Sequence, residues 1–330
     1  MKKILHPVVT IILVLVVFFL LFELALRLFW QMSGLKGELY QKSANKVLRY
    51  EFKPRARLDI PGHYEGVVIN SDGFRGPEYP LKKEKGLYRV VMIGDSVTFS
   101  RLTKWEDSLA QKLEEGLSAG CPGKRFEVLN MGVEGYNSIQ ELELLKVKAL
   151  KYDPDLVIVY YCFNDPDSPE YYFKKNFINR HSLLARYILY RMKKHRIKSD
   201  RLAKGIKSDE DNYRYFYSTQ CWQDAKDAVL EMGDLTNEAG IKMVLLVVTE
   251  LSLPVKDFRE GYPFGYIHQI LAREIRHENI VIIDSLEEFS RINPDISTLR
   301  VWTYPNSKAN DLIAAYAIKK LKEDNINFCN

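Results

Sequence analysis

The stretch RVVMIGDSVT, residues 89–98, decides the fold of this 330-residue chain. It begins with an apolar run from Val90 to Ile93, which is typical of a strand buried on both faces of a parallel sheet. Gly94-Asp95-Ser96 then ends the run with turn-forming residues. Ligands of doubly wound sheets bind beyond the carboxyl ends of the strands, so the stretch predicts that Ser96 lies at a ligand-binding edge.

Further apolar runs alternate with helical patterns along the rest of the chain. The expected strands are Tyr88–Ile93, Phe126–Leu129, Leu156–Tyr161, Lys242–Val248 and Ile280–Ile283, and the expected helices span about 106–118, 138–151, 218–239, 265–277 and 307–322. Apolar strands that alternate with helices predict an α/β fold, here a three-layer α/β/α arrangement around a five-stranded, mostly parallel sheet.

Two more polar clusters follow the second and third expected strands. They are Asn130–Gly135, with the sequence NMGVEG, and Asn164-Asp165. A serine on a tight strand-to-helix turn is exposed and can use nearby backbone N–H groups. A glycine lets its own N–H approach a ligand closely, and an asparagine adds a side-chain donor. Together the three clusters predict a serine nucleophile with a three-donor oxyanion hole.

With these blocks the chain resembles the SGNH/GDSL hydrolase superfamily over about residues 86–322. The resemblance implies that Ser96 is the nucleophile and that its own N–H, Gly135 and Asn164 form the oxyanion hole, with Asp95 and Asp165 in supporting positions. It implies ester hydrolysis or acyl transfer on O-acylated glycans, with no metal and no other cofactor.

The segment NSDGFRGPE, residues 70–78, is similar to the connector of membrane-anchored members of that family. Such members are often associated with bacterial surface polysaccharides. The resemblance therefore extends to the region before the first expected strand and implies a partner at the cell surface.

Two blocks depart from the family pattern. The third block normally reads Gly-x-Asn-Asp, and here Cys162 takes the glycine place. The last block normally carries an aspartate and a histidine before Pro-Asn. Pro305-Asn306 is present, but Tyr304 holds the histidine place, and Val301 or Trp302 holds the aspartate place. The base and its orienting acid are missing from the expected positions.

A serine hydroxyl is a weak nucleophile without a nearby base, and a neutral tyrosine is a poor proton acceptor. His63 or His181 would replace the base if the connector or the insert folded over the site. Asp284, after the fifth expected strand, is either an orienting acid or, more simply, a helix N-cap. These alternatives stay open at the level of sequence.

Three functional hypotheses follow from these blocks. The first is an ester hydrolase or acyltransferase that acts on O-acylated glycans, with an activity impaired by the loss of the Asp and His. The second is a non-catalytic relative that binds an acylated or saccharide ligand at the cell surface. The third, a weaker one, is a membrane-tethered scaffold that uses only a basic insert.

The N-terminal residues 7–30 are apolar except for a few positions, among which Glu23 and Arg27 form an i,i+4 pair. A helix of this length would measure about 36 Å, enough to cross the ~30 Å hydrocarbon core of a bilayer. Lys2 and Lys3 precede it and orient the N-terminus toward the cytoplasm. We expect an uncleaved signal anchor with the main domain outside, in the periplasm. A cleaved signal peptide and a buried core helix are the alternatives.

Residues 173–208 hold twelve Lys or Arg and one acid, Asp200. Apolar residues within them fall at helical spacing, which predicts a basic amphipathic helix. They are Leu183, Leu184, Tyr187, Ile188 and Met192. Such a helix would bind an anionic lipid surface or an anionic polysaccharide, unless it is a solvated helix that packs its apolar side on the domain.

We divide the chain into an anchor (1–30), a polar connector (31–85) and a hydrolase-like domain (86–330) with its basic insert at about 166–217. The chain is 46% apolar and 28% charged, and its net charge of +5 is too small for a typical nucleic-acid-binding protein. Four widely spaced cysteines form no CxxC or Cys/His cluster. We therefore expect no zinc site, and the spacing does not indicate a disulfide.

Overall fold

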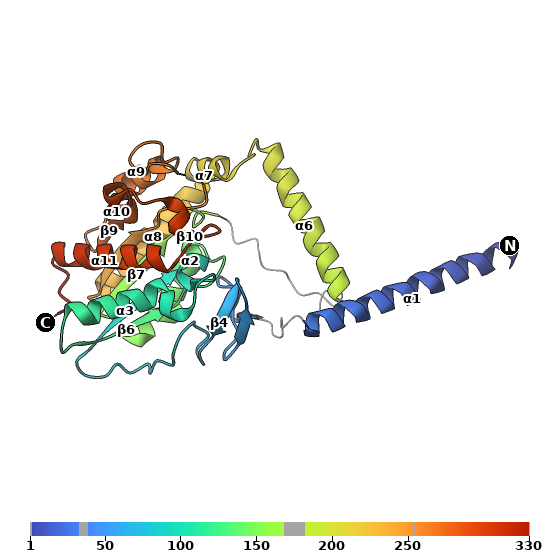
Figure 1. Cartoon of the computed structure of the whole chain (residues 1–330), viewed down its shortest axis with the longest axis horizontal. Coiled ribbons are helices and arrows are strands. Elements are labelled where there is room, and N and C mark those ends of the chain that lie inside the picture. Colours follow the sequence, from blue (N-terminus) through green and yellow to red (C-terminus); the bar gives the residue numbers. More distant parts are fainter. Residues whose placement is uncertain (1, 33–38, 168–181, 254, 330) are drawn as a thin grey trace. The chain divides into compact units, whose positions relative to one another are not determined.

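The computed structural model describes residues 2–32, 39–167, 182–253 and 255–329. The chain divides into two compact units, one made of residues 1–37 and 173–207 and the other of residues 38–172 and 208–330. The first unit holds two long helices, α1 (Lys2–Met32) and α6 (Leu183–Ala203), and the second holds the sheet and its covering helices (Figure 1).

A five-stranded parallel sheet forms the centre of the second unit. Its strands are β5 (Leu87–Gly94), β6 (Arg125–Asn130), β7 (Leu156–Tyr161), β8 (Lys242–Val247) and β9 (Ile280–Asp284). They lie in the order β6-β5-β7-β8-β9, and every neighbouring pair is parallel. The predicted α/β fold and all five predicted strands are confirmed. The strand order reverses between β5 and β7, which is where doubly wound folds bind their ligands.

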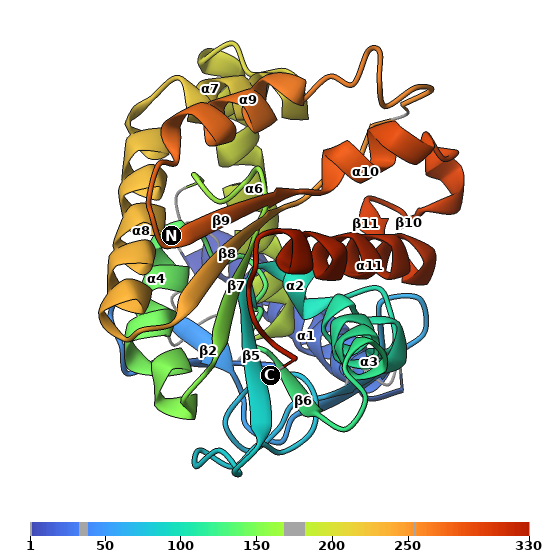
Figure 2. The same cartoon turned by 90° about the vertical axis from the view of Figure 1, so that its left-hand side faces the viewer.

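Helices cover both faces of this sheet (Figure 2). On one face lie α3 (Leu109–Gly120) and α11 (Ser307–Glu323), and on the other lie α4 (Ser138–Val147) and α8 (Gln220–Glu238). Strands β5 and β7 are buried along their whole length, as continuous apolar runs require when both faces are covered. Asn306, from the Pro-Asn motif, begins α11 by accepting a hydrogen bond from the Ala309 N–H at 3.1 Å.

Several short elements differ from the prediction. Helix α7 (Asp209–Tyr217) was not expected, α10 (Ser285–Ile292) was indicated only by the interpretation of Asp284 as a helix N-cap, and α9 (Gly265–Glu274) is shorter than expected. The expected helix 138–151 ends as an α-helix at Val147 and is followed by a 3₁₀ turn at Ala149–Tyr152. One or two helical turns contain too few residues for a clear apolar periodicity, so short elements escape a sequence-based prediction.

The structure corrects the prediction of a connector at 31–85. Residues 38–85 belong to the second unit and form two hairpins, β1 (Tyr40–Lys42) with β2 (Tyr50–Phe52), and β3 (Arg57–Ile60) with β4 (Tyr64–Val68). Apolar side chains from these hairpins and their neighbours are buried in the core of the unit. They are Leu48, Tyr50, Phe52, Val67, Ile69 and Phe74. The strands of these hairpins are short and lie among Gly and Pro residues, so the sequence pattern indicated only a polar connector.

Arg75, within the 70–78 segment, connects this region by hydrogen bonds to the turn that carries Ser96. Its guanidinium is buried and donates hydrogen bonds to the carbonyls of Phe99 (2.8 Å), Ser100 and Thr103 (2.7 Å). The carbonyls of Phe99 and Thr103 thereby gain a donor, and the Ser100 carbonyl, which also accepts from the Thr103 N–H, gains a further one. The 70–78 segment is thus part of the support of the nucleophile turn.

The predicted insert at 166–217 is divided between the two units. Helix α6 belongs to the first unit, whereas α7 packs into the second, where Phe216 and Tyr217 are buried. The predicted basic residues Lys174, Lys175 and Arg180 lie outside the described residues. The amphipathic helix is confirmed as an element, because α6 spans Leu183–Ala203.

In the first unit, α1 is a candidate membrane span by length and composition. Its segment Val9–Leu28 has a mean hydropathy of 3.0. A signal sequence would share both properties. Glu23 and Arg27 form the expected i,i+4 ion pair, with Nε and Oε1 3.0 Å apart. Glu23 also accepts hydrogen bonds from Ser182 Oγ (2.9 Å) and the Leu184 N–H (3.0 Å), so it caps the first turn of α6.

A disulfide joins Cys121, at the end of α3, to Cys329, after α11. The cysteine spacing in the sequence did not indicate this bridge. The two residues are separated by 208 positions, and only the packing of α3 against α11 brings them together. Cys162 and Cys221 are free.

Candidate active site around Ser96

Ser96 is the first residue of α2 (Ser96–Phe99), a single helical turn directly after β5. Asp95 caps this turn: its Oδ1 accepts a hydrogen bond from the Val97 N–H at 2.8 Å. The cap stabilises a sharp change from strand to helix, because it satisfies a backbone donor that the turn leaves unpaired. The half-buried Ser96 hydroxyl therefore stands at the carboxyl end of β5, as the sequence predicts.

The three sequence blocks meet at this edge of the sheet. Gly94 and Tyr160 are paired across β5 and β7, which brings the Asn164 loop beside the Ser96 turn. The Asn164 side-chain amide donates to Asp95 Oδ2 at 3.1 Å. The Val133 N–H donates to the Gly94 carbonyl at 3.0 Å, which brings the second block to the same place.

Gly135 has a backbone conformation that favours glycine, with a φ of +76°. A Cβ at this position would also lie 2.8 Å from the Tyr50 hydroxyl, so there is no room for a side chain. Among the described residues, neither the Gly135 N–H nor the Ser96 N–H has a hydrogen-bond partner. The Asn164 amide keeps one of its two N–H groups after its bond to Asp95. All three implied oxyanion donors are thus available.

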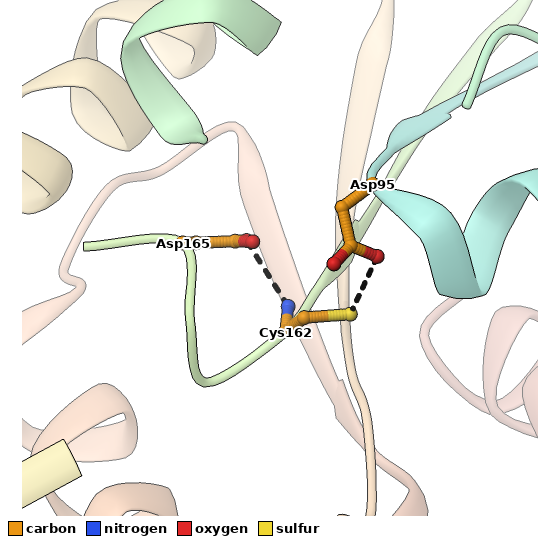
Figure 3. Close-up of side chains that lie close together, drawn as sticks. All are labelled: Asp95, Cys162 and Asp165. Atoms are coloured by element: carbon orange, nitrogen blue, oxygen red, sulfur yellow. Dashed lines mark hydrogen bonds between the residues drawn. The ribbon is translucent and has the colours of Figure 1, made fainter. Parts of the chain in front are cut away.

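Cys162, which takes the place of the family's glycine, is part of the hydrogen-bonded support of the nucleophile turn (Figure 3). Its S–H donates to Asp95 Oδ1 at 3.2 Å and its backbone N–H donates to Asp165 Oδ2 at 3.0 Å. Burial raises the pKa of Cys162, which keeps it a neutral thiol. The thiol therefore acts as a donor to Asp95.

One carboxylate oxygen each of Asp95 and Asp165 and the Cys162 sulfur lie within 4.8 Å of one another, a spacing that would allow a cation. Asp95 already accepts hydrogen bonds from Val97, Asn164 and Cys162. Burial raises the pKa of Asp95 and of Asp165, which favours their neutral forms. We interpret the cluster as structural support, and the absence of a metal stays a prediction.

Tyr304 occupies the place from which a histidine would act. Its hydroxyl donates a hydrogen bond to Ser96 Oγ at 3.2 Å, and Ser96 Oγ lies 3.4 Å from Asp95 Oδ2. Burial raises the pKa of Tyr304. Among the described residues, no imidazole is hydrogen-bonded to Ser96. Val301 and Trp302, at the place of the aspartate, are both exposed.

The structure describes one of the two candidate replacement bases, His63, and shows no hydrogen bond between it and Ser96. His63, between β3 and β4, has its ring centre 4.9 Å from that of Trp302 and perpendicular to it. His181 lies outside the described residues. Asp284 caps α10 through the Leu286 N–H (2.9 Å), which agrees with its interpretation as an N-cap, and it also pairs with His268 Nδ1 at 2.9 Å.

Sequence reasoning missed a cluster around Glu134, next to Gly135. Tyr40 and Tyr64 donate their hydroxyls to the Glu134 carboxylate, Tyr64 at 3.0 Å, and Arg101 Nε lies 3.4 Å away. Tyr50 donates to the Glu134 carbonyl at 2.7 Å.

Burial raises the pKa of Glu134 to about 8. The three tyrosines come from hairpins β1–β2 and β3–β4, so these hairpins hold the loop that presents Gly135. The available signal was the density of tyrosines in a region taken as a linker.

No protein-family model matches the chain, and no curated protein matches its sequence. Solved structures with a similar fold include a GDSL-like lipase from Bacteroides thetaiotaomicron, with 14% identity, a TM-score of 0.41, and coverage of 74% of this chain and 92% of that one. A catalytic mutant of an acetylxylan esterase from Geobacillus stearothermophilus has 15% identity, a TM-score of 0.43, and coverage of 74% and 96%.

A two-domain esterase active on acetylated mannans has 14% identity and a TM-score of 0.43, and the match covers 73% of this chain and 50% of that one. The first of these three bears the family name that the sequence blocks resemble.

Proposed function

We propose that this chain is a membrane-anchored relative of the SGNH/GDSL hydrolases whose ester hydrolase or acyltransferase activity on O-acylated glycans is impaired. The observation that carries the proposal is the hydrogen bond from the Tyr304 hydroxyl to Ser96 Oγ at 3.2 Å. A tyrosine with a pKa raised by burial is a hydrogen-bond donor at neutral pH, so it does not accept the proton of the serine.

The remaining groups support slow chemistry. Attack of Ser96 Oγ on an ester carbonyl carbon requires that the hydroxyl proton leave. The nearest acceptor is Asp95 Oδ2, at a long 3.4 Å, and burial raises the pKa of Asp95, so only its ionised fraction could take the proton. The oxyanion that forms would still meet the N–H groups of Ser96, Gly135 and Asn164. Serine proteases that lose triad members keep about 10³–10⁴-fold catalysis over water, so we expect a severely reduced activity that is still measurable.

Fluorophosphonate labelling of the full-length protein in detergent tests this proposal. Fluorophosphonates react with activated serines, so we expect slow labelling of the wild type and none of Ser96→Ala. An intact serine esterase labelled in parallel sets the rate of an activated serine. Rapid labelling confined to Ser96 would overturn the proposal and would require a base from elsewhere, first His63 or His181.

A non-catalytic binding protein is the second candidate. It is supported by the three available oxyanion donors beside a serine that has no imidazole partner among the described residues. Such a protein would show no labelling at Ser96 while still binding an acylated saccharide. Binding that survives in Ser96→Ala, together with undetectable hydrolysis, would favour this candidate over the impaired enzyme.

We further propose that α1 anchors the chain in the cytoplasmic membrane with Lys2 and Lys3 inside and the second unit in the periplasm. The Cys121–Cys329 disulfide supports this orientation, because disulfides persist in oxidising compartments. Protease treatment of intact spheroplasts tests it. We expect the second unit to be digested, and protection of that unit would show the opposite orientation.

Helix α6 is proposed to bind an anionic lipid surface. Glu23, inside the candidate span, caps the first turn of α6, so the helix would begin close to the membrane. Ile188 and Met192 are exposed and available for the acyl-chain boundary. Each Lys or Arg near an anionic membrane contributes about 1 kcal/mol. An anionic polysaccharide is the alternative ligand of the same charges.

Hydrogen exchange of the full-length protein in nanodiscs tests this role of α6. We expect slower exchange across 183–203 in phosphatidylglycerol discs than in phosphatidylcholine discs. Neutralising Arg191, Lys193, Lys194 and Arg196 should remove the difference, whereas neutralising Lys242, Lys256, Lys319 and Lys322 in the second unit should not. Equal exchange in both lipids, with protection only on addition of an acidic polysaccharide, would assign α6 to that ligand.

A further inference from the structure

Trp302 is the only exposed aromatic side chain among those that the structure describes in the second unit, with 67% of its surface accessible. It stands in the two-residue turn between β10 (Arg300–Val301) and β11 (Tyr304–Pro305). Its ring contact is with His63, whose ring is perpendicular to the indole. This contact therefore leaves at least one face of the indole free. A large apolar surface is thus presented to solvent.

The backbone of Trp302 makes this choice of residue unusual. Its φ is +59°, whereas Thr303 is not among the residues with positive φ. A hairpin turn with a positive φ at its first central position strongly prefers glycine there. A bulky side chain in this conformation is strained, and such strain is concentrated at ligand-binding sites. An exposed tryptophan lowers solubility and is disfavoured in this turn, so its presence at position 302 points to a function for the indole.

The position of Trp302 relates it to the nucleophile. Two residues later, Tyr304 donates its hydrogen bond to Ser96 Oγ. Cα atoms two positions apart are separated by at most about 7 Å, so the indole stands close to the entrance of the Ser96 site. His63 comes from the β3–β4 hairpin, whose Tyr64 also bonds Glu134 beside Gly135. The same hairpin therefore supports both the oxyanion loop and Trp302.

We propose that Trp302, braced by His63, is a stacking platform for a pyranose ring of a saccharide whose O-acyl group lies at Ser96. The apolar C–H face of a pyranose packs on the face of an indole, while its hydroxyls remain in water. This inference rests on the proposed function and adds the side chain that would bind the saccharide part of the substrate. A membrane-binding surface would instead need further exposed aromatic residues or free basic side chains beside Trp302. Thr303 follows it, and the guanidinium of Arg300, two positions before it, donates to the carbonyls of Leu251 and Ser252.

Binding titrations on the full-length protein in detergent test the platform. The probes are acetylated and unacetylated xylohexaose and mannohexaose, followed by calorimetry and by tryptophan fluorescence. We expect Trp302→Ala to weaken binding of the acetylated probe by about tenfold or more, equivalent to about 1.4 kcal/mol. Trp302→Phe should retain most of the affinity because it keeps an aromatic face. Leu81→Ala, which removes another exposed apolar side chain of the second unit, is the control.

Two results would overturn the platform. One is wild-type affinity in Trp302→Ala, and the other is no binding of any of the four probes by the wild type. A blue shift of Trp302 emission in lipid nanodiscs without a response to saccharides would assign the residue to the membrane instead.

The titrations are repeated in Ser96→Ala, where no covalent step can occur. Binding in this variant reports on the platform alone, whereas rapid fluorophosphonate labelling of the wild type reports on failure of the proposed function. The two failures are distinguishable because they have different readouts.

Discussion

Val301 lies directly opposite Tyr304 in the ribbon formed by β10 and β11. Residues that oppose each other in an antiparallel pair point to the same face, with Cβ atoms about 4.5–5.5 Å apart. A carboxylate at position 301 would therefore reach a side chain at position 304. Trp302 belongs to the turn beyond the pair, so of the two candidate positions we infer that 301 is the better place for a carboxylate that would orient a histidine at 304.

Restoring the base alone should recover little activity. Tyr304→His would place an imidazole at Ser96 without a carboxylate to hold its tautomer, a defect that costs about 10⁴-fold in a serine protease. The esterase activity gained by Val301→Asp combined with Tyr304→His should exceed the sum of the gains from the two single variants, because the two side chains face each other. Hydrolysis of p-nitrophenyl acetate, with Ser96→Ala as background, measures the effect.

The matched control for this pair is Trp302→Asp combined with Tyr304→His. It adds the same charge one residue away, in the turn, where it does not face position 304. Equal recovery by both double variants would contradict the assignment of Val301.

Glu134 should make stability depend on pH. Its pKa is about 8 in the folded protein, because it is buried, and near ~4.3 in an unfolded chain. Between these values only the folded state holds the proton, so the free energy of unfolding should fall as pH rises, by at most about 1.4 kcal/mol per pH unit. Denaturant titrations from about pH 5 to about pH 8 measure this, and Glu134→Gln should flatten the profile.

The exposed Glu115 provides the control, since Glu115→Gln should leave the profile unchanged. A wild-type stability that rises with pH over this range, with the same slope in Glu134→Gln, would show that Glu134 does not titrate in this way.

Arg75 should be among the most sensitive positions for stability. Arg75→Met would leave the carbonyls of Phe99 and Thr103 without their donor in the interior and would remove one of the donors to the Ser100 carbonyl. We expect a loss of about 3 kcal/mol or more in the free energy of unfolding. Arg75→Lys should recover only part of this, because an ammonium lacks the planar fork. Arg57→Lys, at an exposed site, is the control and should change the free energy of unfolding by less than about 0.5 kcal/mol. An equally small effect of Arg75→Met would contradict the anchoring role of Arg75.

Trp302→Gly should remove the proposed saccharide platform without lowering the stability of the fold. Relief of the left-handed conformation gains about 1–2 kcal/mol, and the added chain entropy of glycine costs about 0.5–1 kcal/mol, so we expect a small net stabilisation. Thermal unfolding in detergent measures it. Thr303→Gly, at a position without positive φ, should destabilise the protein. A clearly lowered Tm in Trp302→Gly would mean that the indole stabilises the fold through packing.

The disulfide predicts a definite pattern of thiols. Alkylation of the unfolded, unreduced protein should label only Cys162 and Cys221, and reduction should expose Cys121 and Cys329. Cys121→Ser should lower the free energy of unfolding by about 3–5 kcal/mol, since the bridge closes a long loop. Cys221→Ser, at a free and half-buried thiol, serves as the control. Four reactive thiols without reductant would contradict the bridge.

Local patterns in the sequence determined most of the framework. The run Val90–Ile93 followed by Gly94-Asp95-Ser96 predicted a buried strand that ends in a tight turn at Ser96, and the structure has both. The strand ends at Asn130 and Asn164 predicted the other blocks, and Tyr304 in the place of a histidine predicted the loss of the base. Apolar periodicity and turn chemistry depend on neighbours within a few residues, so they can be recognised without a fold.

Only the tertiary structure decided which distant residues support the site. Tyr40 and Tyr64 reach Glu134, His63 meets Trp302, and Cys121 meets Cys329 across 208 positions. No local pattern encodes these contacts, because they depend on how the hairpins and helices pack on the sheet. The sequence alone predicted a polar connector at 31–85. Burial of apolar side chains from residues 39–85 in the core of the second unit makes this part of the chain a support of the site.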